Sequence, residues 1–390
     1  MRDNLKHFPV NWIDGMKINK NLFIAQDDAT KDALHDVAAL SLSPLKYGIL
    51  PSSASGENTY NVKFSLDNQN TLRVTILSCQ AITPGGMRIN IPALGKSGQG
   101  DTDGVPATSF QFSASAGESA YWVVITVHPF EKLPSGNPDI SENPPRLPYV
   151  LPSYQVEVIS NSQYSQFANN PYALMIGKIL VNGSNVRIEE EYIPPCFSIS
   201  AHPDLMTLHG ELDHFLSELE IRGSRIVQKI FKRSQQNELS ELVMFFCDRM
   251  MLYLGQSITN LRWIQAHEAP AALLASIVGL ARVMKNTIDL RIGSGKEEMM
   301  NYLSEWCDLK QGELENMLSN LANLRYDNND VNKNIQPIVF FVKITGKLFE
   351  TLSNLEFIGK RKEAGFFVKE EQQHTDSNTM QQKGRRRFFG

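Results

Sequence analysis

The chain contains only four cysteines in 390 residues, Cys79, Cys196, Cys247 and Cys307, and they lie far apart. None forms a Cys-x-x-Cys pair, so the sequence predicts neither a zinc knuckle nor a disulfide framework. No apolar run approaches the ~20 residues that a membrane-spanning helix needs. The amino terminus also lacks the charged-then-apolar layout of an export signal. We therefore expect a protein of the reducing cytoplasm.

Motifs of catalysis and cofactor binding are absent or incomplete. Gly95-Lys96-Ser97 would end a phosphate-binding loop, but Asn90 stands where that motif needs a glycine. No Gly-x-Ser-x-Gly nucleophile elbow occurs. His209 and His214 are five residues apart on a predicted helix, which turns them apart, whereas a zinc pair is four residues apart. We therefore predict a protein that is not an enzyme and has no cofactor, metal or small-molecule substrate.

Charge is unevenly distributed along the chain. Hydrophobic residues make up 42% and charged residues 21%, which is typical of a folded protein and not of a disordered one. The net charge is −4, but residues 359–390 hold eight Lys and Arg against four Asp and Glu, a charge of +4, so residues 1–358 carry −8. A nucleic-acid binder normally carries its basic patch on the folded domain. We therefore predict no nucleic-acid partner.

The first half of the chain has the pattern of β-strands. Between residues 60 and 193 several runs alternate apolar and polar residues, as Val62, Phe64 and Leu66 do. Successive strand residues point to opposite faces, so such runs can bury one face. Turn clusters rich in Pro, Gly, Asn and Ser separate the runs. This pattern predicts an antiparallel sandwich or barrel over residues 1–198.

Three insertions interrupt these predicted strands. Residues 27–40 predict one short helix with Leu34, Val37 and Ala38 on a shared face. Residues 95–106 form a glycine-rich loop. Residues 132–152 contain six prolines, which predicts an extended surface excursion.

The second half has a helical period. After Pro194-Pro195 apolar residues recur at three- and four-residue steps, which predicts a helical bundle over residues 199–358. Helices are expected from Pro203 onward and over 239–264, 270–288 and 313–324. Residues 335–357 also fit a helix, although 338–344 is β-branched enough for a strand, and we favour the helix.

The first bundle helix carries a long apolar stripe. Its members are Leu205, Leu208, Leu212, Phe215 and Leu219. One interpretation is that they are core residues of a single bundle. The other is that the stripe packs between copies of the chain and builds an oligomer along the helices.

The end of the chain, residues 359–390, is predicted to be a disordered basic tail. Its last cluster is Arg385, Arg386, Arg387, Phe388 and Phe389. It could be a solvated end. It could also be a docking segment whose arginines pair with carboxylates, and whose phenylalanines fill an apolar pocket, on a partner protein.

Three segments together resemble the TssK family, baseplate proteins of type VI secretion systems. The first is residues 10–16, Val-Asn-Trp-Ile-Asp-Gly-Met, followed by Phe23 and by Lys46-Tyr47-Gly48 in place of a Trp-Gly turn. The second is residues 191–200, Glu-Tyr-Ile-Pro-Pro-Cys-Phe-Ser-Ile-Ser, which resembles the family's strand-to-helix junction. The third is His267-Glu268-Ala269-Pro270, which leads into a Leu- and Ala-rich helix. The resemblance covers roughly residues 8–325.

The resemblance implies a fold, partners and a location. It implies an amino-terminal β-sandwich shell, a helical neck and a carboxy-terminal head in a homotrimer at the inner-membrane-proximal baseplate of a bacterium. The shell would bind a TssF–TssG wedge and the head a membrane-complex protein. It also implies wedge contacts at Trp12, Asp14, Gly15, Met16 and Phe23. The other interpretation of these residues is that Trp12 and Met16 are core and Gly15 makes a turn.

The chain departs from the family at its end. After Tyr326 about 65 residues remain, too few for the usual head domain. A protein of another class, a phage-tail-like adaptor or a carbohydrate-binding adhesin, would also combine a sandwich with a helical stalk. An adhesin should carry an export signal, which we do not find.

Overall fold

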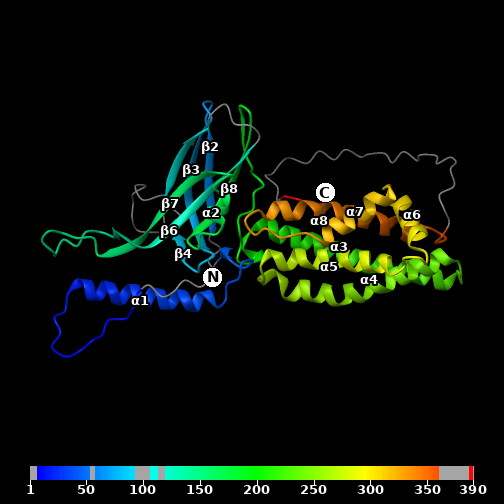
Figure 1. Ribbon diagram of the computed structural model, residues 1–390, viewed down its shortest axis with the longest axis horizontal. Helices are drawn as coiled ribbons and strands as arrows, with labels where there is room; N and C mark the ends of the chain where they lie inside the picture. The colour runs from blue at the N-terminus through cyan, green and yellow to red at the C-terminus, as the bar shows by residue number, and fades with distance from the viewer. Residues whose placement is uncertain (1–6, 53–57, 93–105, 113–118, 360–385, 390) are drawn as a thin grey trace. The chain divides into compact units, whose positions relative to one another are not determined.

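Alternating residues build the strands of the first half, and the three- to four-residue period builds the helices of the second. The computed structural model describes residues 7–52, 58–92, 106–112, 119–359 and 386–389. Antiparallel β-sheets are followed by helices, which confirms the predicted fold class (Figure 1). The chain divides into two compact units. Unit 1 is Met1–His202 with Glu268–Pro270 and Asp327–Asn332, and unit 2 is the remainder.

The first sheet of unit 1 is organised around one long strand, β3 (Thr71–Ile82). Four shorter strands pair with it in antiparallel fashion: β1 (Gly48–Ile49), β2 (Tyr60–Leu66), β4 (Arg88–Ile91) and β5 (Ala107–Gln111). Leu72, Val74 and Ile76 of β3 are fully buried. Their alternation with more accessible residues is the pattern that predicted this strand.

The second sheet has the order β7-β6-β8-β9, with β6 (Ser119–Ser135), β7 (Tyr149–Ser160), β8 (Ala173–Asn182) and β9 (Asn185–Ile188). The inner part of β6 and most of β8 are apolar on successive residues and do not alternate. Both of their faces are covered. On one face Trp122 and Met175 are buried with Tyr192, and Tyr164 and Phe167 of the short helix α2 (Tyr164–Ala168) pack there.

The two sheets face each other, as a sandwich requires. The ring of Phe64 on β2 lies so close to Gly177 on β8 that a Cβ on this glycine would be 2.6 Å from it. Between the sheets, the Tyr60 hydroxyl donates a hydrogen bond to the Ile176 carbonyl oxygen at 2.6 Å. Phe112 meets Tyr121 edge to face, with ring centroids 5.0 Å apart. The core of unit 1 therefore lies between the sheets.

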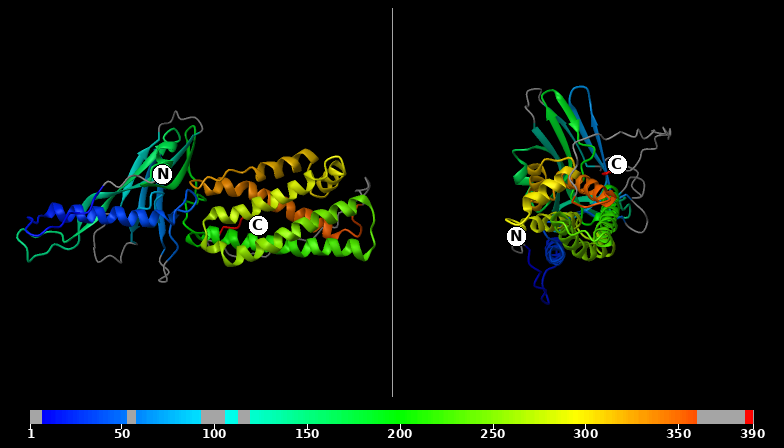
Figure 2. Two further views of the ribbon diagram at one scale, coloured as in Figure 1. Left: turned by 60° about the horizontal axis from the view of Figure 1, so that its bottom comes forward. Right: turned by 90° about the vertical axis from the view of Figure 1, so that its right-hand side faces the viewer.

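Helix α1 (Lys20–Ala39) starts seven residues before the predicted helix. The Asn19 side chain accepts hydrogen bonds from the backbone N–H groups of Asn21 and Leu22 and caps it. Leu34 and Val37, of the predicted shared face, are about two-thirds exposed. In Figures 1 and 2 the helix lies along the outer part of the β6–β7 hairpin.

Residues 132–152 were predicted as an extended surface excursion. The ends of this stretch are strand, because β6 and β7 continue outward as a two-stranded ribbon that pairs Leu133 with Leu151 and Pro134 with Val150. A ribbon has two open edges, so a proline without an N–H is tolerated there. The glycine-rich loop at 95–106 lies outside the described residues except for Pro106.

Unit 2 is a bundle in which long helices run side by side (Figures 1 and 2). Its helices are α3 (Pro203–Lys232), α4 (Glu238–Trp263), α5 (Pro270–Asp289), α6 (Lys296–Trp306), α7 (Gln311–Ala322) and α8 (Val331–Asn354). The helical interpretation of residues 335–357 is confirmed by α8. Helix α6 was not among the predicted helices. Its Met299, Met300 and Leu303 are buried.

By length and composition alone, α5 is apolar enough to cross a membrane, which the sequence analysis did not recognise. Leu273, Ile277, Leu280 and Met284 on this helix are buried within the bundle. A helix in the core of a bundle has a similar length and apolar composition, so these two properties alone do not make α5 a membrane span.

Candidate interaction surfaces

The amino-terminal arm, residues 7–19, carries most of the predicted partner residues. Trp12 is 46% exposed and Phe23 on α1 is 59% exposed, and their ring centroids are 6.1 Å apart. Asp14 and Gly15 are exposed and Met16 is half-buried. Trp12 is therefore not the core residue of the alternative interpretation. Gly15 does make a turn, with φ at +79°.

Polar contacts hold the arm and α1 in place. The Asp32 carboxylate accepts a hydrogen bond from the His7 backbone N–H at 2.9 Å and lies 3.0 Å from His7 Nδ1. Lys132 of β6 reaches Asp27 and Asp28, with 2.8 Å to each. The Asp28 and Asp32 side chains are 13% and 10% exposed and lie on the inner side of α1, whereas large apolar residues of the helix face outward. We call this outward set Phe23, Leu34 and Val37 the α1 face.

Parts of the three segments that carry the sequence resemblance, 46–48, 191–200 and 267–270, meet in unit 1. The Ile49 N–H donates to the Pro195 carbonyl oxygen at 2.8 Å, and the Phe197 N–H donates to the Ile49 carbonyl at 2.9 Å. Lys46 forms an ion pair with Glu268 at 2.9 Å. We call this meeting of residues 46–49, 194–197 and 268 the junction.

Glycine is required at the centre of the junction. Gly48 has φ at +116°, a region that side chains with a Cβ rarely adopt. A Cβ there would lie 1.9 Å from the Pro195 carbonyl oxygen. The Glu268 carbonyl oxygen also accepts the Ile199 N–H at 2.9 Å. Residues 46–49 and 194–199 thus work as structural residues, and their surroundings hold them in one arrangement.

A strap at residues 327–330 completes unit 1, and the sequence analysis missed it. The Tyr47 hydroxyl donates to Asn329 Oδ1 at 3.0 Å, and the Tyr192 hydroxyl donates to the Asn329 carbonyl at 2.7 Å. Burial raises the pKa of both tyrosines, so both keep the proton that they donate. Lys178 forms an ion pair with Asp330 at 2.5 Å. The polar run at 327–330 was the available signal, but such runs usually mark simple loops.

The apolar stripe on α3 is core. Leu205, Leu208 and Leu212 are fully buried within a single chain, and Phe215 and Leu219 are nearly so. Phe215 meets Phe341 of α8 edge to face at 6.5 Å between ring centroids. The prediction that this stripe packs between copies is therefore wrong. The helices of one bundle cover it, because α3 lies among them and not on an open stalk.

Four of the five predicted tail residues are described, and Arg385 lies outside the described residues. Arg386, Phe388 and Phe389 are half-buried, while Arg387 is exposed. The Phe388 backbone N–H donates to the carboxylate of Glu211 on α3. The tail tetrapeptide 386–389 therefore contacts its own unit 2.

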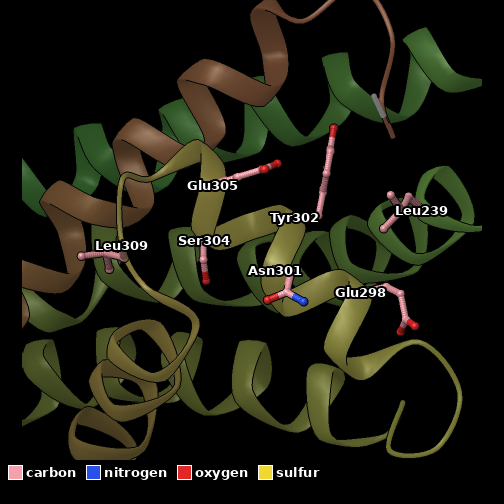
Figure 3. Close-up of a pocket in the computed structure, with 7 residues that line it drawn as sticks. All are labelled: Leu239, Glu298, Asn301, Tyr302, Ser304, Glu305 and Leu309. Atoms are coloured by element: carbon pink, nitrogen blue, oxygen red, sulfur yellow. The ribbon is translucent and has the colours of Figure 1, made fainter. Parts of the chain in front are cut away.

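Unit 2 also contains an open pocket of about 360 Å³ (Figure 3). Its lining is mostly polar and comprises Leu239, Glu298, Asn301, Tyr302, Ser304, Glu305 and Leu309. The Tyr302 hydroxyl accepts a hydrogen bond from the Gly359 N–H at 2.9 Å. The lining contains two carboxylates but no histidine, cysteine or lysine. It offers no nucleophile paired with a base.

The cysteines are not arranged for chemistry. All four are buried and free. Burial raises the pKa of Cys79 and of Cys247 to about 12, so neither carries appreciable thiolate at neutral pH. In the part of the chain that the structure describes, no group of three or more His, Cys, Asp or Glu residues could hold a metal ion. His209 Nε2 instead lies 2.9 Å from the Leu261 carbonyl oxygen.

No protein-family model matches this sequence, and no curated protein matches it significantly. Solved structures do match. One is a crystal structure of TssK, with 12% sequence identity and a TM-score of 0.48, covering 88% of this chain and 68% of that one. The chain is similar in structure to TssK over most of its length.

Two further matches are TssK structures of the type VI secretion system. TssK from EAEC in complex with a nanobody matches with 13% identity and a TM-score of 0.43, over 84% of this chain and 99% of that one. The TssK–TssF–TssG baseplate subcomplex, solved by cryo-electron microscopy, contains a chain with 15% identity and a TM-score of 0.43. That match covers 88% of this chain and 99% of the other.

Proposed function

We propose that this protein is a structural component of a type VI secretion baseplate. It joins a TssF–TssG-like wedge to a membrane-anchored complex, on the cytoplasmic side of a bacterial inner membrane. The observation that carries the proposal is the junction. The segments of sequence resemblance at 46–48, 191–200 and 267–270 are distant in the chain but meet there. These three parts of the resemblance therefore belong to one structural element, whereas its part at 10–16 and Phe23 lies in the arm and on α1.

The wedge contact is assigned to the amino-terminal arm and the α1 face. Trp12 and Phe23 are large apolar residues that remain exposed and contact each other. Exposed aromatic residues of this kind are the usual anchors of protein interfaces. Asp14 and Gly15 lie beside them on the exposed turn.

Co-purification with the wedge proteins tests this assignment. The variant Trp12→Ser with Phe23→Ser should fold normally, since both side chains are exposed, and should lose most of the wedge binding. Trp263→Ser is the matched control, because Trp263 is a more exposed aromatic in unit 2. Equal wedge recovery with the unmodified protein and with both variants would refute the assignment.

We also propose that the protein acts as a homotrimer. The α3 stripe is excluded as the contact, so the trimer must form along other surfaces. The mass of the full chain in solution at micromolar concentration should be three times 43.8 kDa. A mass of 43.8 kDa under these conditions would refute the trimer.

The membrane link is assigned to the basic tail. Residues 359–390 carry +4 on a chain whose remainder carries −8. Its arginines and phenylalanines can pair with carboxylates and fill a pocket on a membrane-complex protein. Truncation after Ile358 should leave the number of subunits in the oligomer unchanged and reduce secretion. Unchanged secretion would show that the tail is dispensable.

A further inference from the structure

The tail tetrapeptide 386–389 makes a specific contact with α3. Its Phe388 backbone N–H donates to both carboxylate oxygens of Glu211, at 3.2 Å to Oε1 and 2.9 Å to Oε2. A hydrogen bond to an ionised acceptor is roughly twice as strong as one between neutral groups. Glu211 is itself half-buried. This contact therefore fixes one point of the tail backbone on one point of the helix.

The tetrapeptide is also ordered internally. The guanidinium of Arg386 lies 4.4 Å from the centroid of the Phe388 ring, which is a cation–π contact. Arg386 and Phe388 are half-buried and the intervening Arg387 is exposed. Phe389 is half-buried as well, so only Arg387 of the tetrapeptide faces solvent.

Charge favours the same site. Asp204, Glu211 and Glu218 follow one another at seven-residue steps and so share one side of α3. Glu218 forms an ion pair with Arg222 at 3.2 Å, and the Glu211 carboxylate accepts the hydrogen bond from the Phe388 backbone N–H. The approaching tail segment carries three consecutive arginines. An acidic side of a helix therefore meets a basic peptide.

We propose that the carboxy-terminal Arg-Arg-Phe-Phe segment is a built-in peptide ligand of the bundle, and that the side of α3 around Glu211 is its docking site. The 26 residues from 360 to 385 connect it to the end of the bundle. At ~3.3–3.6 Å per residue they reach at most ~90 Å, which is ample for docking on the same chain. A membrane-complex protein that binds the tail must therefore compete with the docking site around Glu211.

A labelled peptide of residues 380–390 tests the proposal by fluorescence polarisation. It should bind saturably to the chain truncated after Gly359, in which the site is free. Binding to the full chain should be at least about tenfold weaker, because the tethered copy competes at high effective concentration. Equal binding to both proteins, or binding to neither, would overturn the proposal.

Variants on both sides separate the site from general charge attraction. In the truncated chain, Glu211→Gln should weaken peptide binding about tenfold. Glu220→Gln should not, since Glu220 lies on the opposite side of the same helix. A peptide with Phe388→Ser and Phe389→Ser keeps every arginine and leaves the protein unchanged. If that peptide binds as tightly as the native sequence, only charge is recognised and the docking site does not exist.

Discussion

At the scale of single residues, Gly48 tests the junction. Alanine there would combine a positive φ with a Cβ 1.9 Å from a backbone oxygen. We expect Gly48→Ala to lower the free energy of unfolding of unit 1 by at least ~2 kcal/mol. Calorimetric unfolding of the full chain measures this change.

Two other glycines are matched controls for Gly48. Gly183 has φ at +60°, but nothing lies within 4 Å of the position that a Cβ would take, so Gly183→Ala should cost only about 1 kcal/mol. Gly210 lies in α3 with open space and no positive φ, so Gly210→Ala should be neutral or stabilise by up to ~1 kcal/mol. Equal effects of all three substitutions would contradict the described junction.

Asp289 gives a pH-dependent prediction. Burial raises the pKa of this carboxyl, but hydrogen bonds from Lys285 and Lys296 outweigh burial and hold the pKa below its ordinary value. A carboxyl whose pKa is lowered on folding stabilises the protein above its unfolded pKa of about 4, and this contribution is lost as pH falls through the folded pKa. Asp289→Asn should therefore cost about 0.5–1 kcal/mol at pH 7.

Urea unfolding of Asp289→Asn at several pH values measures this contribution. The difference from the unmodified protein should shrink as pH falls below the ordinary carboxyl range and through the lowered folded pKa, because the native carboxyl is then protonated as well. Lys296→Met removes one of the partners, at 2.8 Å, and should reproduce part of the loss at neutral pH. A difference that persists unchanged at low pH would mean that the ion pair is not its source.

At the scale of elements, the strap depends on its buried ion pair. The side chains of Lys178 and Asp330 are 19% and 5% exposed, and Lys178 also lies 5.1 Å from the Trp122 ring centroid. Removing one partner leaves a charge without compensation, so Asp330→Leu should cost about 3–5 kcal/mol.

The double variant Lys178→Met with Asp330→Leu should recover a large part of that loss. It removes both charges and leaves apolar groups of similar size. A double-mutant cycle by chemical unfolding measures the coupling. Additive effects of the two substitutions would show that the pair is not coupled. This outcome would leave the tyrosine hydrogen bonds to Asn329 as the main attachment of the strap.

At the scale of the whole molecule, the β part is not independent of the later sequence. Unit 1 contains Glu268–Pro270 and Asp327–Asn332. A fragment of residues 1–198 lacks both segments and leaves Lys46, Lys178 and three tyrosines without their partners. We expect this fragment to melt well below unit 1 in the full chain. A fragment as stable as unit 1 in the intact protein would show that the later segments add nothing.

Interactions within single segments determined what could be predicted from the sequence. In a strand with one buried face, apolar and polar residues must alternate. In an amphipathic helix, apolar residues must recur every three to four positions. β3, α4, α5 and α8 follow these rules, and so they were predicted. The requirement for glycine at position 48 was visible only as a resemblance, because it arises from contact with Pro195, which is distant in sequence.

Only the tertiary structure decided which faces are covered. β6 and β8 carry apolar residues on both faces because α2 and Tyr192 cover the outer face of the second sheet. The local sequence pattern does not predict this cover. The α1 face points outward, while Lys132, which is distant in sequence, pairs with Asp28 on the inner side of the helix. The α3 stripe is core because other helices surround it. Burial depends on what packs against a segment, and that partner is distant in sequence in each case.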